Sequence, residues 1–192
     1  MPNWCQNSVT FTHADPKEIQ RMKDAFLADN LLHEFVPLPA ELKDTASGSY
    51  GDPVEQAKLQ AQVDTNLEKH GYATWYEFCI NEWGTKWDVS GYDDGIVALT
   101  ENSITLLFDT AWSPPIAWYE RLLEQGWGVS GYYNEEGMAY CGRYEDGIDD
   151  YYEYSDLSAE EVADQLPSDI DECFSISERK AEWEAEQEYE DE

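Results

Sequence analysis

Alternating polar and apolar positions open the chain. The segment Trp4–Thr12 alternates with a period of two residues and places Val9 and Phe11 on one face, which predicts a β-strand. Asp15 and Pro16 then predict a helix start, because an Asp N-cap and a proline at the first helical position suit the free N–H groups there. Apolar residues follow at helical spacing, at Ile19, Met22 and Phe26.

The hydrophobic patterns between residues 31 and 80 are less regular. Leu31–Pro39 is apolar but contains two prolines, which predicts an extended crossing rather than a central strand. Residues 44–52 are rich in Ser and Gly and predict a loop. A second helix is predicted from about Asp52 or Pro53 to His70, because Gly71 supplies a C-terminal stop. Residues 73–80 fit a short helix or a strand equally well.

Two similar segments follow, at 87–92 and 127–132, each reading Trp-x-Val-Ser-Gly-Tyr. Each leads into two acidic residues and a glycine, and a third such turn follows. Because glycine tolerates positive φ, these turns, at 93–95, 135–137 and 145–147, predict β-hairpins. A strand is predicted at Ile104–Phe108. A helix that opens at Ser113 and ends at Gly126 follows it, and a three-stranded meander then ends near Tyr154.

These elements predict an α+β protein, an antiparallel sheet with helices on one face. We expect a body at residues 1–157, with a helical insertion at about 40–82. A C-terminal segment, 158–192, is acidic and helical. It opens with a capping box at Ser158, breaks at Pro167, and continues as a helix from about Ser177.

Charge changes this picture most. The chain has 11 Lys and Arg against 42 Asp and Glu, for a net charge of −31. Residues 131–192 alone contain 22 acidic and 3 basic residues. Such a field attracts basic partners and repels nucleic acid and anionic membranes. Aromatic residues make up 14% of the chain, which argues for a folded body rather than a disordered one.

Other bulk features bear on the compartment. No apolar run approaches the ~20 residues of a membrane span, and the first residues lack the basic and apolar regions of a secretory signal. The four cysteines are scattered and have no C-x-x-C spacing. We therefore expect reduced thiols in a host cytoplasm, with neither a disulfide framework nor a metal site.

Three motifs carry a resemblance to a known family: MPNWCQN at 1–7, NEWGTKWD at 81–88 and FDTAWSPP at 108–115. They resemble the YubB-type family of phages and plasmids. The resemblance implies a ferredoxin-like domain and a mobile-element setting. It supplies no established reaction, cofactor or catalytic residue.

Two acidic surfaces are candidates for partner binding. In the tail, Glu178, Glu182 and Glu186 recur every four residues, so a helix places them ~6 Å apart along its axis. Phosphates along one nucleic-acid strand recur at a spacing of the same order. A solvated, frayed tail explains the same pattern, because like charges at this spacing disfavour an isolated helix. A protein-docking helix anchored by Trp183 also explains this pattern.

The second surface lies on the meander, where acidic and aromatic residues alternate. Such mixtures suit Arg-rich partners, through charge pairing and cation–π contact, although a charged sheet edge gives the same pattern. A calcium site is a further alternative, but no segment matches an EF-hand loop. The partner-binding candidates here are Glu135, Glu136, Glu145, Asp146, Asp149, Asp150, Tyr151, Tyr152, Glu153 and Asp156.

The block Trp83–Asp88 is a secondary candidate. Lys86 lies between Trp83 and Trp87, so the block suits an anionic ligand, or equally a structural junction between helix and sheet. Motifs of known enzymes are missing: the chain has no Gly-rich phosphate loop, no G-x-S-x-G, and no His at metal-ligand spacing to Cys.

The leading hypothesis is therefore a non-enzymatic acidic protein, without cofactor, that occupies the basic nucleic-acid-binding site of a host protein. Its specific form is a DNA mimic that inhibits a restriction or CRISPR defence system. Two alternatives remain open: a small-ligand binder or enzyme built on the Trp83–Asp88 block, and a structural accessory protein with a solubilising tail.

Overall fold

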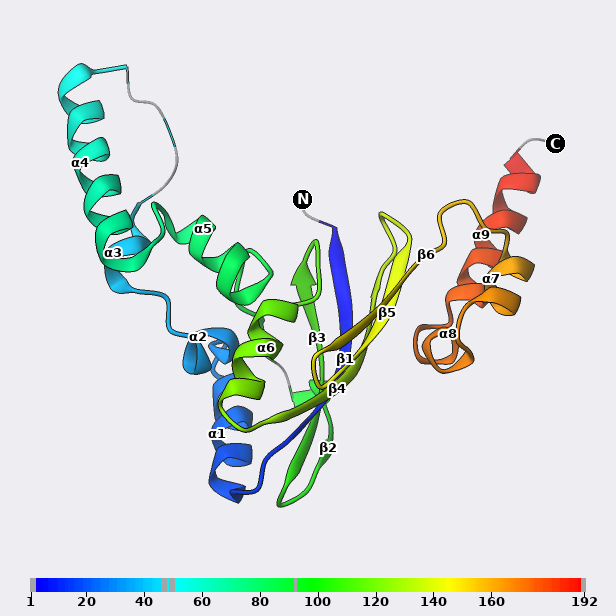
Figure 1. Ribbon diagram of the computed structural model, residues 1–192. Coiled ribbons are helices and arrows are strands. Elements are labelled where there is room, and N and C mark those ends of the chain that lie inside the picture. The colour runs from blue at the N-terminus through cyan, green and yellow to red at the C-terminus, as the bar shows by residue number, and fades with distance from the viewer. Residues whose placement is uncertain (1–2, 46–47, 49–50, 92, 191–192) are drawn as a thin grey trace.

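A six-stranded antiparallel sheet forms the centre of the computed structural model, which describes residues 3–45, 48, 51–91 and 93–190 (Figure 1). The strand order is β2-β3-β1-β4-β5-β6. Helical connections join β1 to β2 and β3 to β4, and hairpins join β2 to β3, β4 to β5 and β5 to β6. The strands are β1 (Trp4–Thr12), β2 (Ile96–Leu99), β3 (Ser103–Ala111), β4 (Gly128–Glu135), β5 (Tyr140–Glu145) and β6 (Ile148–Glu153).

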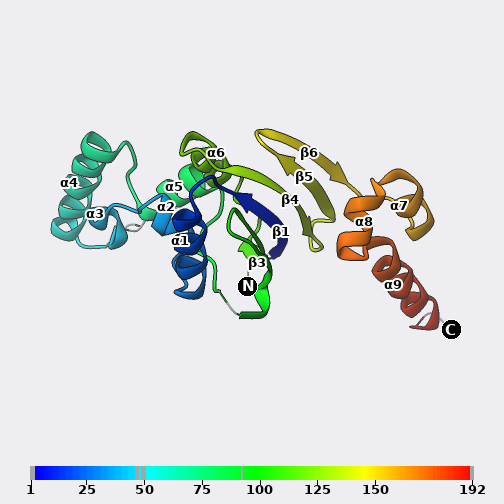
Figure 2. The ribbon, with the colours of Figure 1, turned by 90° about the horizontal axis from the view of Figure 1, so that it is seen from below.

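Helices cover the first face of the sheet, as the α+β prediction requires. Alternation along β1 turns Val9 and Phe11 toward this face, where Phe11 packs edge-on against Trp118 with ring centroids 5.6 Å apart. Asp15 caps the first helix through the backbone N–H of Lys17. The covering helices are α1 (Pro16–Leu27), α2 (Leu31–Phe35) and α6 (Ile116–Glu124) (Figures 1 and 2).

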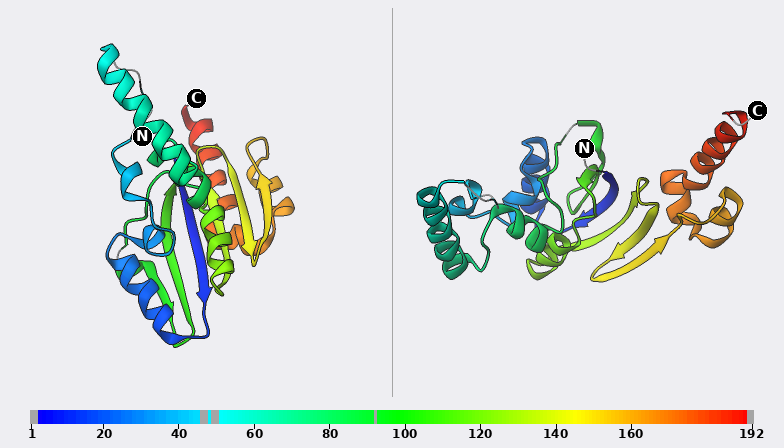
Figure 3. Two further views of the ribbon diagram at one scale, coloured as in Figure 1. Left: turned by 60° about the vertical axis from the view of Figure 1, so that its left-hand side comes forward. Right: turned by 90° about the horizontal axis from the view of Figure 1, so that it is seen from above.

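An insertion projects from this layer. It contains α3 (Ala40–Lys43), α4 (Pro53–His70), α5 (Trp75–Phe78) and a π-helical turn, η1 (Cys79–Trp83). Helix α4 has the predicted bounds, because Asp52 accepts hydrogen bonds from two N–H groups at its start and Gly71 ends it with φ 78°. It stands away from the sheet in Figures 1 and 2 and in the right-hand view of Figure 3.

The C-terminal segment forms three helices, which pack on the second face of the meander: α7 (Ala159–Gln165), α8 (Ser168–Phe174) and α9 (Ile176–Glu190). They share a separate hydrophobic cluster with Cys141 of β5 and Tyr154, in which Val162 and Ile170 are fully buried. Helices thus lie on both faces of the sheet, not on one. The predicted capping box at Ser158 is present, with Glu161 as its partner.

Two local predictions are wrong. Leu31–Phe35 is helical rather than extended, because Asp88, far along the chain, accepts hydrogen bonds from the N–H groups of Leu32 and His33 at 2.7 and 2.9 Å. The turn at 93–95 is a 3-10 helix, η2 (Asp93–Gly95), and the hairpin between β2 and β3 turns instead at 100–102.

The remaining expectations divide between described and undescribed residues. The ambiguous stretch 73–80 is helical, and the break at Pro167 begins α8. Parts of some predicted features lie outside the described residues. These are Met1 and Pro2 of the first motif, Tyr92 of the repeated segment, Glu192 of the tail and part of the 44–52 loop. No helix in the described part of the chain is long and apolar enough to cross a membrane.

Candidate functional site

Much of the predicted meander surface is engaged within the fold. Glu135 does not belong to an exposed surface: it is 1% exposed, and its carboxylate accepts hydrogen bonds from the N–H groups of Gly137 and Met138 at 2.9 and 2.7 Å. Asp146 accepts a hydrogen bond from the N–H of Val129 at 2.9 Å. These carboxylates hold the two hairpin turns together.

The other meander acids lie on opposite faces of the edge strand β6. Asp150 and Tyr152 point toward α8, and Asp150 pairs with Arg143 at 2.7 Å. Asp149, Tyr151 and Glu153 point the other way.

On that other face, the side chains hold one another. Asp149 accepts a hydrogen bond from the Tyr133 hydroxyl at 2.8 Å, and burial raises the pKa of Asp149. Tyr151 donates to Glu153 at 3.1 Å. Glu145 and Asp156 are exposed at opposite ends of the meander. The predicted residues therefore do not form one continuous surface.

The tail ladder is presented differently. Glu178, Glu182 and Glu186 are exposed along one side of α9, and none makes a hydrogen bond or ion pair with any residue the structure describes. Helix α9 itself is fixed. Asp171 accepts hydrogen bonds from the N–H and hydroxyl of Ser177 at 2.7 and 2.6 Å, and Ile176 is buried in the second cluster.

Residues of the Trp83–Asp88 block serve mainly to join parts of the fold. Trp83 is 4% exposed and donates its indole N–H to the carbonyl of Val36 at 2.9 Å. Asp88 caps α2, as described above. Lys86 is surrounded by aromatic rings: its Nζ lies 4.5 Å from the ring centroid of Trp87 and 5.2 Å from that of Trp112. These contacts favour the structural interpretation of the block.

The cysteines offer little for nucleophilic chemistry. All four are free, and three are buried. Burial raises the pKa of Cys79 and of Cys141 to about 12, so neither thiol ionises near neutral pH. Among the described residues, no group of three or more His, Cys, Asp or Glu side chains is placed to hold a metal ion.

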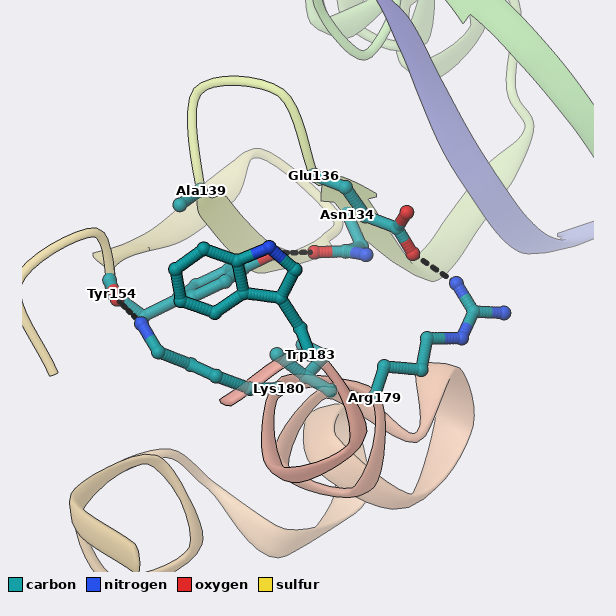
Figure 4. A pocket seen from close by; sticks show the side chains of 8 residues that line it. Asn134, Glu136, Ala139, Tyr154, Arg179, Lys180 and Trp183 are labelled. Carbon is teal, nitrogen blue, oxygen red and sulfur yellow. Dashed lines mark hydrogen bonds and ion pairs between the residues drawn. The ribbon is translucent and has the colours of Figure 1, made fainter. Parts of the chain in front are cut away.

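Sequence reasoning missed a groove between the second face of the sheet and α8–α9. Arg179 of α9 crosses it to form an ion pair with Glu136 in the turn between β4 and β5 (Figure 4). Three cavities meet at this pair. One of about 290 Å³ is lined by both residues, one of about 320 Å³ by Arg179, and one of about 300 Å³ by Glu136.

Figure 4 looks into the first of these cavities. Lys180 donates to the carbonyl of Tyr154 at 3.1 Å, and Trp183, 57% exposed, forms part of the wall. Behind the Trp183 indole in Figure 4, the Tyr154 hydroxyl donates to Oδ1 of Asn134 at 2.8 Å.

The third cavity is lined by Asn3, Trp4, Gln6, Asp109, Glu135, Glu136 and Gly137. Two of its lining residues come from strands distant in sequence: Gln6 of β1 pairs in register with Asp109 of β3. Gln6 also pairs with Asn134 of β4, which lines the first cavity, so the three side chains form a row on the second face. Only the alternation within each strand signals this from sequence, because the register that aligns the three strands is a tertiary property.

Neither a family model nor a curated protein matches this chain. Among solved structures, it is similar to the crystal structure of the protein api92 from Yersinia pseudotuberculosis, which carries the family model DUF1281. The identity is 14% and the TM-score 0.38, over 81% of this chain and 99% of api92. A likeness this distant leaves the function to be argued from the side chains themselves.

Proposed function

We propose that this protein is a non-enzymatic binding protein whose helix α9 docks into the basic, nucleic-acid-binding groove of a host protein and so mimics DNA. The observation that carries the proposal is the row formed by Glu178, Glu182 and Glu186. These carboxylates are exposed and have no internal partner in the described part of the chain. They project from a helix with its own buried cluster, so little ordering entropy opposes binding.

Charge supports the same partner class. A net charge of −31 accelerates encounter with a basic protein and removes the counterion-release term that favours direct binding to nucleic acid. The competition is electrostatic: carboxylates take the positions of phosphates on the partner, and arginines there bind either group.

The origin of the protein and its cellular compartment are also part of the proposal. The resemblance to the YubB-type family supports a phage or plasmid protein acting in the host cytoplasm, with a restriction or CRISPR effector as a suitable target. Free cysteines suit that reducing compartment. The order β2-β3-β1-β4, with helical crossovers after β1 and β3, supports a ferredoxin-like arrangement of the first four strands.

The test is capture from a bacterial lysate on the immobilised protein, at low and moderate salt, followed by elution with duplex DNA. We expect basic nucleic-acid-binding proteins to be captured, to elute with the DNA, and to be held less tightly as salt rises. The variant E178Q/E182Q/E186Q should lose most of this capture, because each substitution removes one charge from the row.

The matched control is E68Q/E101Q/E120Q, which removes the same number of charges from exposed positions outside the C-terminal segment. It should retain capture. If both variants capture the same proteins as the original chain, or if DNA does not displace them, α9 is not a nucleic-acid mimic.

A further inference from the structure

The floor of the groove holds polar atoms that the described fold leaves without partners. Asp109, an exposed residue, makes no hydrogen bond or ion pair there, and partial burial raises the pKa of its carboxyl. Beside it, Oε1 of Gln6 is shielded from solvent and unpaired. Next in the row, Asn134 is 1% exposed, and its Nδ2 also lacks a partner. Native folds pair most buried polar atoms, so the unpaired Oε1 of Gln6 beside an unpaired carboxylate calls for an explanation.

The shape and lining of the third cavity indicate what kind of group pairs with Oε1 of Gln6 and with Asp109, whereas Asn134 lines the first cavity and its Nδ2 is a donor. Its volume is about 300 Å³, and its walls include the carboxylates of Asp109 and Glu136, the side chain of Gln6, and Trp4, which is 50% exposed. Carboxylates and an amide oxygen accept hydrogen bonds, and the face of an indole attracts cations, so together these groups suit a planar cation. Anions are disfavoured, because none of the described residues that line this cavity is positively charged.

The fold already demonstrates part of this recognition. At the rim, Glu136 binds the guanidinium of Arg179 (Figure 4). Asp109 lines the same cavity with no such partner among the described residues. Of the three carboxylates that line the cavity, Glu136 pairs with an internal arginine and Glu135 accepts backbone N–H groups, so Asp109 alone has no partner among the described residues.

We propose that the cavity lined by Trp4, Gln6, Asp109 and Glu136 binds an arginine side chain of the basic partner. The guanidinium pairs with Asp109, donates a hydrogen bond to Oε1 of Gln6 and lies against the Trp4 indole. Arginine is preferred over lysine, because its planar fork pairs with a carboxylate and stacks on a ring at once. That this arginine belongs to the basic partner rests on the proposed function, whereas the preference of the cavity for a guanidinium group does not.

The test uses N-acetyl-L-arginine amide as the probe and N-acetyl-L-citrulline amide as its neutral counterpart of the same shape. Binding is followed by NMR on protein with ¹⁵N-labelled tryptophan, with the Trp4 indole signal assigned by Trp4→Phe. We expect the arginine probe to shift the Trp4 signal saturably, and the citrulline probe to leave it unchanged over the same concentrations.

Asp109→Asn should weaken binding of the arginine probe at least tenfold, because it removes the unpaired charge with little change in shape. Glu68→Gln, which removes one charge from the exposed surface of α4, should bind as the original chain does. Equal shifts with both probes, or full binding by Asp109→Asn in a protein whose amide spectrum is unchanged, would overturn the proposal.

The two proposals fail separately. The variant E178Q/E182Q/E186Q should still bind the arginine probe, because its substitutions lie outside the cavity lining. If the arginine probe does not bind, but proteins are still captured through α9 and released by DNA, the proposed arginine site is wrong and the proposed function remains supported. If capture fails and the probe still binds selectively, the site stands without that partner.

Discussion

Asp109 of β3 and Glu135 of β4 are both acidic residues of the central sheet, but one carboxylate is used within the fold and the other is available for binding. Glu135 is buried, and two backbone N–H groups compensate for the lost hydration. Asp109 is more exposed and has no such donor among the described residues. The sequence alone does not distinguish them, because the distinction depends on which turn or cavity each carboxylate faces.

Asp109→Asn is predicted to raise stability near neutral pH. The folded-state pKa of Asp109 lies above its ordinary value through burial, so this group's contribution to stability is complete below the unfolded pKa and is lost as pH rises through the folded pKa. The amide avoids that loss. Urea midpoints should therefore be higher for the variant at pH near 7, and the difference should shrink below about pH 4.

The control for this prediction is Glu101→Gln, which removes one charge from an exposed position. Its gain should be smaller than that of Asp109→Asn at neutral pH. An Asp109→Asn variant that is no more stable than Glu101→Gln would contradict the argument that burial, rather than net charge, sets the cost.

At the scale of elements, local chemistry accounts for what was predictable. Helix α1 and helix α4 carry their own caps in sequence, and the Glu145-Asp146-Gly147 turn carries its own glycine, at φ 99°. The two similar segments diverge because their surroundings differ. Val129 belongs to β4, whereas Asp88 in the first copy caps α2. No local pattern reveals a cap from more than fifty residues away.

The groove and its cavities escaped prediction for the same reason. Arg179 and Glu136 are separated by 43 positions, and Gln6 meets Asp109 only through strand pairing. By contrast, the α9 ladder was found from sequence, because its spacing is a property of one helix.

Ile170→Ala is predicted to loosen α7–α9 selectively. Ile170 is fully buried in the second cluster, which is separate from the cluster around Phe11 and Trp118, and truncation there typically costs about 2–5 kcal/mol. Hydrogen exchange should accelerate in α9 and remain slow in β1. Val54→Ala, which trims an apolar side chain that is 62% exposed, should change neither. Equal acceleration in α9 and β1 would mean that the two clusters open as one unit.

For the whole molecule, the governing quantity is self-repulsion at a net charge of −31. Ion pairs do not offset it, because those described involve few cations and mostly exposed side chains, and exposed pairs contribute little.

Salt therefore screens more repulsion than attraction. The thermal midpoint should rise between about 20 and about 300 mM sodium chloride, as the screening length falls from ~20 to ~6 Å. In E178Q/E182Q/E186Q the rise should be smaller, since three charges are gone from a single helix face. A midpoint that falls with sodium chloride would show that attractive pairs dominate and that the carboxylates are better compensated within the fold than the exposure of α9 implies.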